Sequence, residues 1–322
     1  KQDLILAGGA EALSHAPLVL RQGAVEWFAE MNRAKGPVAQ ARAMAGLRPD
    51  FFKPVIGLER GPTDSITTLN MGQTAEVLAH RFGIDRKTAD AYAMDSHHRL
   101  AKAQEEGWLD DEVMTAFDSE DGEVYDHDDG VRPDNDMESL AKLSPAFEKP
   151  YGQVTPGNSS QITDGASWVI VASEAAVEEH GLKPIARIVD SEWAGLDPSV
   201  MGLGPVLCAT PLVMRNGYAL DRIDLWELNE AFAAQVLSCV AAWNDADFCR
   251  DILGLEGAFG QIDRDRLNVD GGAISLGHPV GTSGNRIVLH LANAMKRRGD
   301  KIGVATECIG GGLGGAMLLE AV

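Results

Sequence analysis

The 322-residue sequence has few cysteines, little positive charge and no long apolar run. Its four cysteines, Cys208, Cys239, Cys249 and Cys308, stand at irregular spacings without a Cys-x-x-Cys pair. This argues against a disulfide framework and a structural zinc site, and favours a reducing compartment. No run of about 18 apolar residues is present, so no membrane span is expected. Lysine and arginine number 28 against 48 acidic residues, and the formal charge of −20 argues against a nucleic-acid partner. An anionic small ligand would need a local group of basic side chains.

Strand-like and helical segments alternate along much of the chain. The apolar run from Leu4 to Ala7 is typical of a buried strand, and residues 166–182 read as a buried strand followed by a helix. From 17 to 147 the pattern is mainly helical, with Thr68 or Asn70 as the expected N-cap of one helix. This order predicts a layered α/β fold with a helical excursion from a sheet domain.

The stretch GGAISLGHPVGTSGNRI contains a histidine in an unusual setting. Gly277 and Gly281 leave the imidazole of His278 accessible, Pro279 fixes the backbone that follows it, and a helix is expected from about Ser283. A lone histidine is more often structural. Glycines before a helix can also hold a phosphate, but the Walker pattern is absent.

The stretch LWELNEAFAAQ places Asn229 and Glu230 after an apolar strand, where they are expected to open a helix. Capping alone would explain Asn229. Its amide could also hold a water that points at a developing oxyanion.

The stretch ATECIGGGLGG places Cys308 before three consecutive glycines. A buried, inert cysteine is the commonest fate of this residue. A thiol beside glycine N–H groups could also be a general acid or base with an oxyanion donor next to it, and the glycines would let a thioester approach the backbone. No second group of ligands accompanies the histidines of the helical section, so no metal site is expected.

Taken together, these motifs resemble the thiolases, the family of acyl-CoA acetyltransferases and 3-ketoacyl-CoA thiolases. LAGGAEALS, NMGQTAE, VTPGNSSQITDGA and DPSVMGLGP match the family in the same order. The resemblance implies a thiolase-like layered αβαβα fold with two similar core domains and an inserted, mainly helical loop domain. The expected boundaries are 1–17 for the end of the N-terminal core domain, 18–147 for the loop domain, 148–180 for the rest of the N-terminal core domain and 181–322 for the C-terminal core domain.

The resemblance also implies chemistry on coenzyme A thioesters: thiolytic cleavage of 3-ketoacyl-CoA, or the reverse Claisen condensation of acetyl-CoA. Coenzyme A is then a substrate, and no permanently bound cofactor is expected. His278 would activate the nucleophile, and Cys308 would be the second, acid/base cysteine. Asn229 would hold the water of one oxyanion hole, and the N–H of Gly310 would serve the other.

Further residues match positions that bind the substrate in this family. Ser160 would face the pantetheine and Arg132 would contact the nucleotide phosphate. Met71, Met201 and Phe232 resemble residues that line the acyl and pantetheine pocket, although a plain core role fits these three equally well.

One departure concerns the nucleophilic cysteine of the family, which lies upstream of the LAGGAE strand. None of the four cysteines matches it, so the chain is expected to lack an N-terminal segment and to obtain that cysteine from a partner segment. A homodimer or tetramer is expected, in the cytoplasm or in a mitochondrial or peroxisomal matrix. The long stretch at 241–272 is expected to form an extra helix at the surface or the pocket rim. This stretch and Asn70 favour a β-oxidation enzyme that accepts longer acyl chains, and a multienzyme β-oxidation complex is a further expectation. A non-catalytic acyl-CoA or lipid carrier and a ketoacyl synthase-like enzyme are alternatives that the intact His-Pro and Cys-Ile-Gly motifs disfavour.

Overall fold

The computed structural model describes residues 2–57, 61–118 and 122–322. Its largest described sheet has four strands in the order β7 (Ala186–Gly195), β10 (Leu313–Ala321), β9 (Ile302–Ile309) and β8 (Leu225–Leu228). The strands β7, β10 and β9 are antiparallel, whereas β8 and β9 are parallel and joined by a long crossover. Because β8 and β9 are parallel, their carboxyl ends meet at one edge of the sheet.

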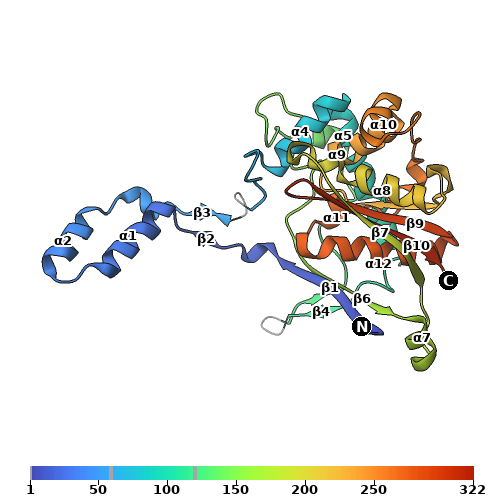
Figure 1. Ribbon diagram of the computed structural model, residues 1–322, viewed down its shortest axis with the longest axis horizontal. Helices are drawn as coiled ribbons and strands as arrows, with labels where there is room; N and C mark the ends of the chain where they lie inside the picture. Colours follow the sequence, from blue (N-terminus) through green and yellow to red (C-terminus); the bar gives the residue numbers. More distant parts are fainter. Residues whose placement is uncertain (1, 58–60, 119–121) are drawn as a thin grey trace.

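Helices cover both faces of this sheet (Figure 1). The helix α12 (Val280–Arg298) packs on β8 and β9, and α8 (Gly204–Arg215) packs on β7 and β10. Side chains alternate across a strand, so in β9 Val304 faces the core that includes α8, whereas Ala305 faces the core that includes α12. This arrangement is the layered α/β fold that the sequence predicts.

A second, two-stranded sheet lies on α12. It consists of β1 (Leu4–Ala12) paired antiparallel with β6 (Asp164–Ala172). The prediction of a buried strand at 4–7 is wrong about burial, because Leu6 and Ile170 are each 66% exposed. Their apolar composition suits a covered strand, but what covers a strand is a tertiary property that its own residues do not encode.

The region after β1 forms an arm that projects from the body of the molecule (Figure 1). The short strands β2 (Leu18–Val19) and β3 (Val55–Ile56) pair at its base, and α1 (Gln22–Arg33) and α2 (Pro37–Ala45) form its outer part. We call residues 17–57 the projecting arm. It belongs to the mainly helical section that the sequence predicts.

The rest of this section packs on the body through α4 (Met71–Phe82) and α5 (Arg86–Glu105). Of the two predicted caps, Asn70 is the one that caps α4: its side chain accepts from the backbone N–H of Gln73, whose own side chain accepts from the N–H of Asn70. Thr68 lies outside the helix.

Two helix starts differ from the prediction. The helix α9 (Ala233–Asn244) begins after Phe232, not at Asn229 or Glu230, whose side chains make other contacts described below. The helix α12 begins at Val280, three residues before Ser283. The extra helix expected in 241–272 exists as α10 (Ala246–Leu253), and it packs Phe248 into the core.

The remaining elements are short. They are η1 (Leu13–His15), η2 (Pro49–Phe52), β4 (Ala116–Phe117), β5 (Val124–Tyr125), α6 (Met137–Ala141), α7 (Glu174–His180), η3 (Pro198–Leu203), η4 (Leu220–Arg222), η5 (Arg264–Arg266) and α11 (Ala273–Leu276). Among the described residues, no helix combines the length and the apolar character needed to cross a membrane.

Candidate active site

A hydrogen bond joins two of the predicted residues. Nδ2 of Asn229 lies 3.3 Å from Nε2 of His278. Nδ1 of His278 lies 2.6 Å from Oγ of Ser283, whose hydroxyl donates to the carbonyl of Pro279. Because the amide NH₂ can only donate and the hydroxyl proton is already engaged, the proton of the neutral imidazole lies on Nδ1. Nε2 then carries the lone pair and can accept a proton.

The surroundings of His278 keep its ring neutral. Burial lowers the pKa of His278 to about 4, and the nearby charge of Arg286 acts in the same direction. A histidine that is neutral at pH 7 is ready to act as a general base.

The parallel pair of strands brings Asn229 close to Cys308. Asn229 directly follows β8, and its backbone N–H donates to the carbonyl of Thr306 in β9 across 3.0 Å. Cys308 lies two residues further along β9. In open α/β sheets ligands bind outside the carboxyl ends of such strands.

An apolar cluster surrounds the Cys308 thiol. Cys308 packs with Met201 and Ala231, and Met71 and Phe232 complete the cluster. All three predicted lining residues therefore touch the cluster that contains the predicted thiol. Sδ of Met71 would also lie 3.8 Å from a Cβ added at Gly310, in the tight turn between β9 and β10.

The polar turn at residues 155–163, which contains Ser160, passes along the same edge. The backbone N–H of Ser160 donates to the carbonyl of Ala231, and the N–H of His278 donates to the carbonyl of Gln161, each across 3.0 Å. The turn therefore connects the loop after β8 with the His-Pro loop.

The thiol of Cys308 is protonated at neutral pH. Burial, together with the charge of Glu307, raises the pKa of Cys308 to about 12. The other three cysteines are buried elsewhere: Sγ of Cys239 donates to the carbonyl of Gly202, and Cys208 and Cys249 also make backbone contacts. Of the four cysteines, Cys308 alone belongs to the cluster beside Asn229.

Comparison with known proteins identifies the family. The models for the thiolase N-terminal and C-terminal domains match residues 1–175 and 182–321. The 3-ketoacyl-CoA thiolase of Yersinia pestis is 36% identical over 320 residues, which are 99% of this chain and 72% of that protein. The chain belongs to the thiolase family.

Solved structures agree with this assignment. Human mitochondrial 3-ketoacyl-CoA thiolase superposes with a TM-score of 0.80 at 35% identity, covering 99% of this chain and 72% of that one. The acetyl-CoA acetyltransferase of Bacillus anthracis gives the same TM-score and coverage at 34% identity. The predicted family, fold class and acyltransferase class are confirmed.

The nucleophilic cysteine expected upstream of the LAGGAE strand is not among the four cysteines of this chain. The model of the thiolase N-terminal domain matches from residue 1 onwards. The chain spans 72% of the length of the relatives named above.

One residue of this thiolase has a role that the sequence does not predict. Glu230 is fully buried, and its carboxylate accepts from the hydroxyls of Tyr92 and Ser96, each at 2.7 Å, and from Nδ2 of Asn268 at 3.0 Å. It therefore anchors the loop that carries Asn229. A carboxylate within an otherwise apolar stretch is the signal that could have indicated such an anchor.

Asn229 itself has an unused acceptor. Its Oδ1 is buried and has no hydrogen-bond partner among the described residues. Buried polar atoms of this kind are commonly satisfied by water. The position suits the water-holding role that the family resemblance implies for Asn229.

Arg132 lies on an exposed turn near the rim of the site. Its backbone N–H donates to Nδ1 of His97, and Gln161 donates to the carbonyl of Gly130 two residues earlier. The turn that carries Arg132 is thus held against the same polar segment that contacts His278.

Proposed function

We propose that this thiolase cleaves 3-ketoacyl-CoA with coenzyme A as the acyl acceptor, in the degradative direction of fatty-acid β-oxidation. The observation that carries the proposal is the contact between Asn229 and His278 beside the Cys308 cluster. A neutral base in contact with an amide, and a thiol at the end of the neighbouring strand, support this reaction.

His278 serves as the base for the attacking thiol. The attacking thiol is the nucleophilic cysteine of the family, which is not among the four cysteines of this chain. Nε2 takes its proton, the thiolate attacks the 3-keto carbon of the substrate, and the shortened acyl group stays on this sulfur until coenzyme A takes it up. The bond between C2 and C3 then breaks, and the electron pair remains on C2 as the enolate of acetyl-CoA.

Cys308 returns a proton to that enolate. A thiol whose pKa burial and Glu307 raise to about 12 is fully protonated in the resting site. The enolate carbon is far more basic than a thiolate, so the transfer runs from Sγ to C2. The same thiol and thiolate pair serves the condensation in reverse, so the raised pKa supports Cys308 as the proton donor of the cleavage step.

Two oxyanion holes complete the proposed machinery. A water held by Oδ1 of Asn229, together with His278, serves one oxyanion, and the N–H of Gly310 serves the other. Each preorganised donor of this type contributes about 3 kcal/mol to transition-state stabilisation.

The substrate lies along the polar turn in this proposal. Ser160 faces the pantetheine, and Arg132 contacts the nucleotide phosphate at the exposed rim. Met71, Met201 and Phe232 line the acyl and pantetheine pocket. A solved human mitochondrial 3-ketoacyl-CoA thiolase is a complex with CoA, which supports coenzyme A as the ligand of this chain. The domain boundaries 1–17, 18–147, 148–180 and 181–322 belong to the same proposal.

Thiolysis of short-, medium- and long-chain 3-ketoacyl-CoA tests this function, followed as loss of enolate absorbance. A second assay follows exchange of the α-protons of acetyl-CoA with deuterium from solvent. Replacement Cys308→Ala is expected to lower both rates by about 10²–10⁴-fold, the usual contribution of a general acid or base. Replacement Cys249→Ala, in the core, is the matched control. Equal exchange rates in wild type and Cys308→Ala would refute the role of Cys308.

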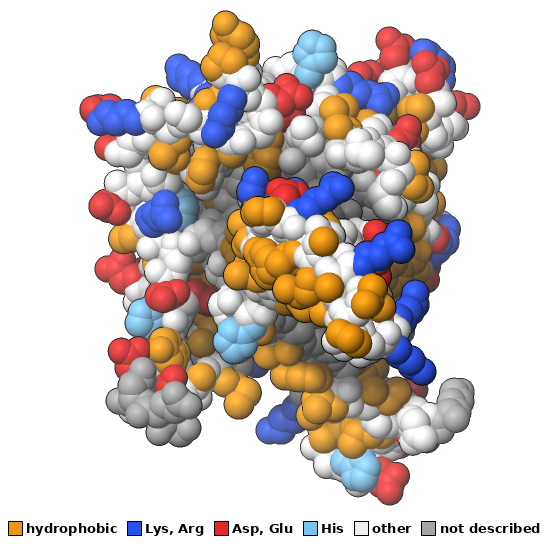
Figure 2. Space-filling view, turned by 90° about the vertical axis from the view of Figure 1, so that its left-hand side faces the viewer, with side chains coloured by type: hydrophobic (Ala, Val, Ile, Leu, Met, Phe, Trp, Pro, Cys, Tyr) orange, Lys and Arg blue, Asp and Glu red, His pale blue; other side chains and the backbone are white. Residues whose placement is uncertain are grey.

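We also propose that the chain assembles into a homodimer or tetramer in the cytoplasm or an organelle matrix. Support comes from the projecting arm: Figure 2 shows hydrophobic side chains gathered on this face, and Leu18, Val38 and Phe52 are 68%, 83% and 58% exposed. Exposed apolar side chains gathered on one face are typical of interaction surfaces. Light scattering after size exclusion should show more than one copy, and a double replacement Val38→Asp, Phe52→Asp should reduce the assembly. A monomer at micromolar concentration would contradict the proposal.

A further inference from the structure

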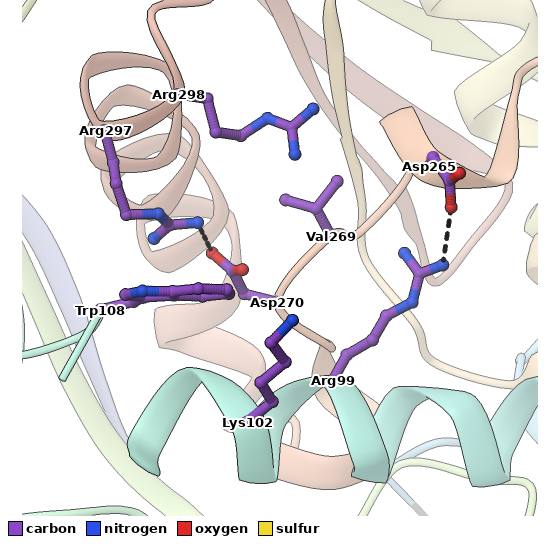
Figure 3. Close-up of a pocket in the computed structure, with 8 residues that line it drawn as sticks. All are labelled: Arg99, Lys102, Trp108, Asp265, Val269, Asp270, Arg297 and Arg298. Atoms are coloured by element: carbon purple, nitrogen blue, oxygen red, sulfur yellow. Dashed lines mark hydrogen bonds and ion pairs between the residues drawn. The ribbon is translucent and has the colours of Figure 1, made fainter. Parts of the chain in front are cut away.

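A pocket separate from the active site lies between the ends of α5 and α12 (Figure 3). Its volume is about 480 Å³, within the usual range for small-molecule sites. It is lined by Arg99, Lys102, Trp108, Asp265, Val269, Asp270, Arg297 and Arg298. Half of these residues are cationic, although the whole chain carries a formal charge of −20. We call this cavity the α5–α12 pocket.

The pocket is far from the proposed catalytic residues. The helix α12 starts two residues after His278 and ends at Arg298, and its 19 residues span about 28 Å at 1.5 Å per residue. On α5, Lys102 follows His97 by five residues, which places it about 140° further around the helix. His97 binds the turn that carries Arg132. The α5–α12 pocket therefore lies on another side of α5 from the proposed coenzyme A contact.

Three of the four cations in the pocket have acidic partners. Arg99 pairs with Asp95 at 2.8 Å and lies 3.8 Å from Asp265, and Arg297 pairs with Asp270. Nε of Arg298 lies 2.7 Å from the carboxylate of Asp300. The two carboxylates of the lining, Asp265 and Asp270, are thus each within reach of an arginine.

Lys102 differs from these three, because it has no ion pair within the described part of the chain. Its ammonium instead lies 5.4 Å from the centre of the Trp108 ring, and the guanidinium of Arg297 lies 4.5 Å from the centre of the same ring. Two positive groups therefore share one indole and lie within about 10 Å of each other. Their mutual repulsion favours an anion that both can reach.

The shape of the lining selects the kind of anion. The guanidinium of Arg298 extends into the space beside Val269, opposite Lys102 (Figure 3). Arginine binds phosphate oxygens through parallel N–H donors, whereas lysine acts as a compact point charge. A single phosphate would leave most of the cavity empty, so a chain of phosphates fits the spacing of the cations better.

We propose that the α5–α12 pocket binds an oligophosphate group, with Lys102 and Arg298 as its main ligands and Arg297, over Trp108, as a third. The group is either an inorganic oligophosphate or the phosphate chain of a nucleotide. The site is independent of the proposed thiolase reaction, and its test does not depend on activity.

Calorimetric titration at low ionic strength tests the site, with inorganic tripolyphosphate and ATP as probes. Lys102→Gln and Arg298→Gln are each expected to weaken binding about tenfold, since each removes a charge-assisted contact, and Lys102→Arg should retain it. The matched control is Lys183→Gln, at an exposed lysine outside the pocket. A second control, Arg132→Gln, should leave binding unchanged. If ATP binds more tightly than tripolyphosphate, the nucleoside also contacts the site, and equal affinities assign binding to the phosphates alone.

Three results would overturn the proposal. The first is no saturable binding of either probe to the wild-type protein. The second is an equal loss of probe affinity in Lys102→Gln and Lys183→Gln, which would mean that only the general surface charge attracts the anion. The third is a loss of probe affinity in Arg132→Gln alone, which would place the probes in the proposed coenzyme A site.

Discussion

The hydroxyl of Tyr92 donates to the carboxylate of Glu230 across 2.7 Å, although 138 residues separate them in the chain. Tyr92 belongs to α5 of the helical section, and Glu230 directly follows Asn229 in the loop after β8. The helical section thereby holds in place the loop that presents the Asn229 amide to His278. A loop fixed in this way keeps its catalytic groups oriented before the substrate arrives.

Replacement Tyr92→Phe is therefore expected to affect turnover more than substrate binding. It removes one donor from a buried carboxylate, which costs about 1–3 kcal/mol of stability. The loosened Asn229 should lower kcat severalfold while KM changes little. Steady-state thiolysis and urea unfolding measure the two effects, and Tyr151→Phe, at a residue that is 88% exposed, is the control. A rise in KM at constant kcat would contradict the positioning role of Tyr92.

The low pKa of His278 predicts the acid limit of activity. Burial and the charge of Arg286 bring the pKa of His278 to about 4 from the usual 6.5. The base should therefore remain competent well below pH 6.5, and the acid limb of kcat/KM that belongs to His278 should lie near pH 4. In the unfolded state His278 takes up a proton near pH 6.5, whereas in the folded state it does so only near pH 4. The free energy of unfolding therefore decreases as the pH falls from 6.5 to about 4.

Replacement Arg286→Met tests the electrostatic part of that shift. Removing the positive charge should raise the pKa of His278, because a nearby cation disfavours the imidazolium. NMR titration of the ring and the pH profile of kcat/KM should both move towards higher pH. Arg187→Met, at an arginine that is 64% exposed and pairs with Glu320, is the control. An unchanged titration in Arg286→Met would show that burial alone sets the pKa.

The sequence predicts this site better than it predicts the surroundings. His278, Asn229 and Cys308 stand in short motifs whose residue types indicate the chemistry. The parallel pairing of β8 and β9 brings Asn229 and Cys308 to the same edge of the sheet. The role of Glu230 depends on Tyr92 and Ser96, which are more than 130 residues away. A helix start at Asn229 or Glu230 was the natural prediction from local capping rules, but both side chains are used in tertiary contacts.

The dependence on tertiary contacts also explains the other differences between the sequence-based predictions and the structure. The residues of β1 are apolar, but whether Leu6 is buried depends on which elements cover the strand. The α5–α12 pocket joins Lys102 and Arg298 from two distant helices, and no periodicity within either helix indicates that they meet. Local pattern predicts elements and motifs, whereas burial and composite sites arise from how the elements pack.

Replacement Glu307→Gln is expected to make the Cys308 thiol more acidic. After burial itself, the charge of Glu307 is the next cause of the raised pKa of Cys308. Burial also raises the pKa of Glu307 to about 7, so part of this effect should disappear below pH 7 even in the wild type. Alkylation of Cys308 by iodoacetamide at pH 8, with the site identified by mass spectrometry, should become faster in Glu307→Gln. An equal rate in both proteins would contradict the coupling of Glu307 to Cys308.

A buried ion cluster around His290 predicts how stability depends on pH. Nδ1 of His290 lies 2.7 Å from Glu112, and Nε2 lies 3.3 Å from Asp270 and 3.8 Å from Glu227. Burial alone would lower the pKa of His290, but the carboxylates raise it to about 10. Because the folded value exceeds the usual 6.5, the stabilisation is complete below pH 6.5 and is lost as the pH rises through about 10.

Replacement His290→Gln should therefore destabilise the fold by about 3–5 kcal/mol at pH 6, since it leaves buried carboxylates without their cation. Urea unfolding from pH 6 to pH 10 measures the difference in free energy of unfolding between the wild type and the variant. This difference should become smaller as the pH rises, because the wild-type imidazolium then loses its proton. Adding Glu227→Gln to His290→Gln should recover part of the stability by removing one uncompensated charge. His180→Gln, at the exposed end of α7, controls for loss of a histidine as such. A difference in free energy of unfolding that stays constant from pH 6 to pH 10 would mean that His290 is neutral in the folded protein.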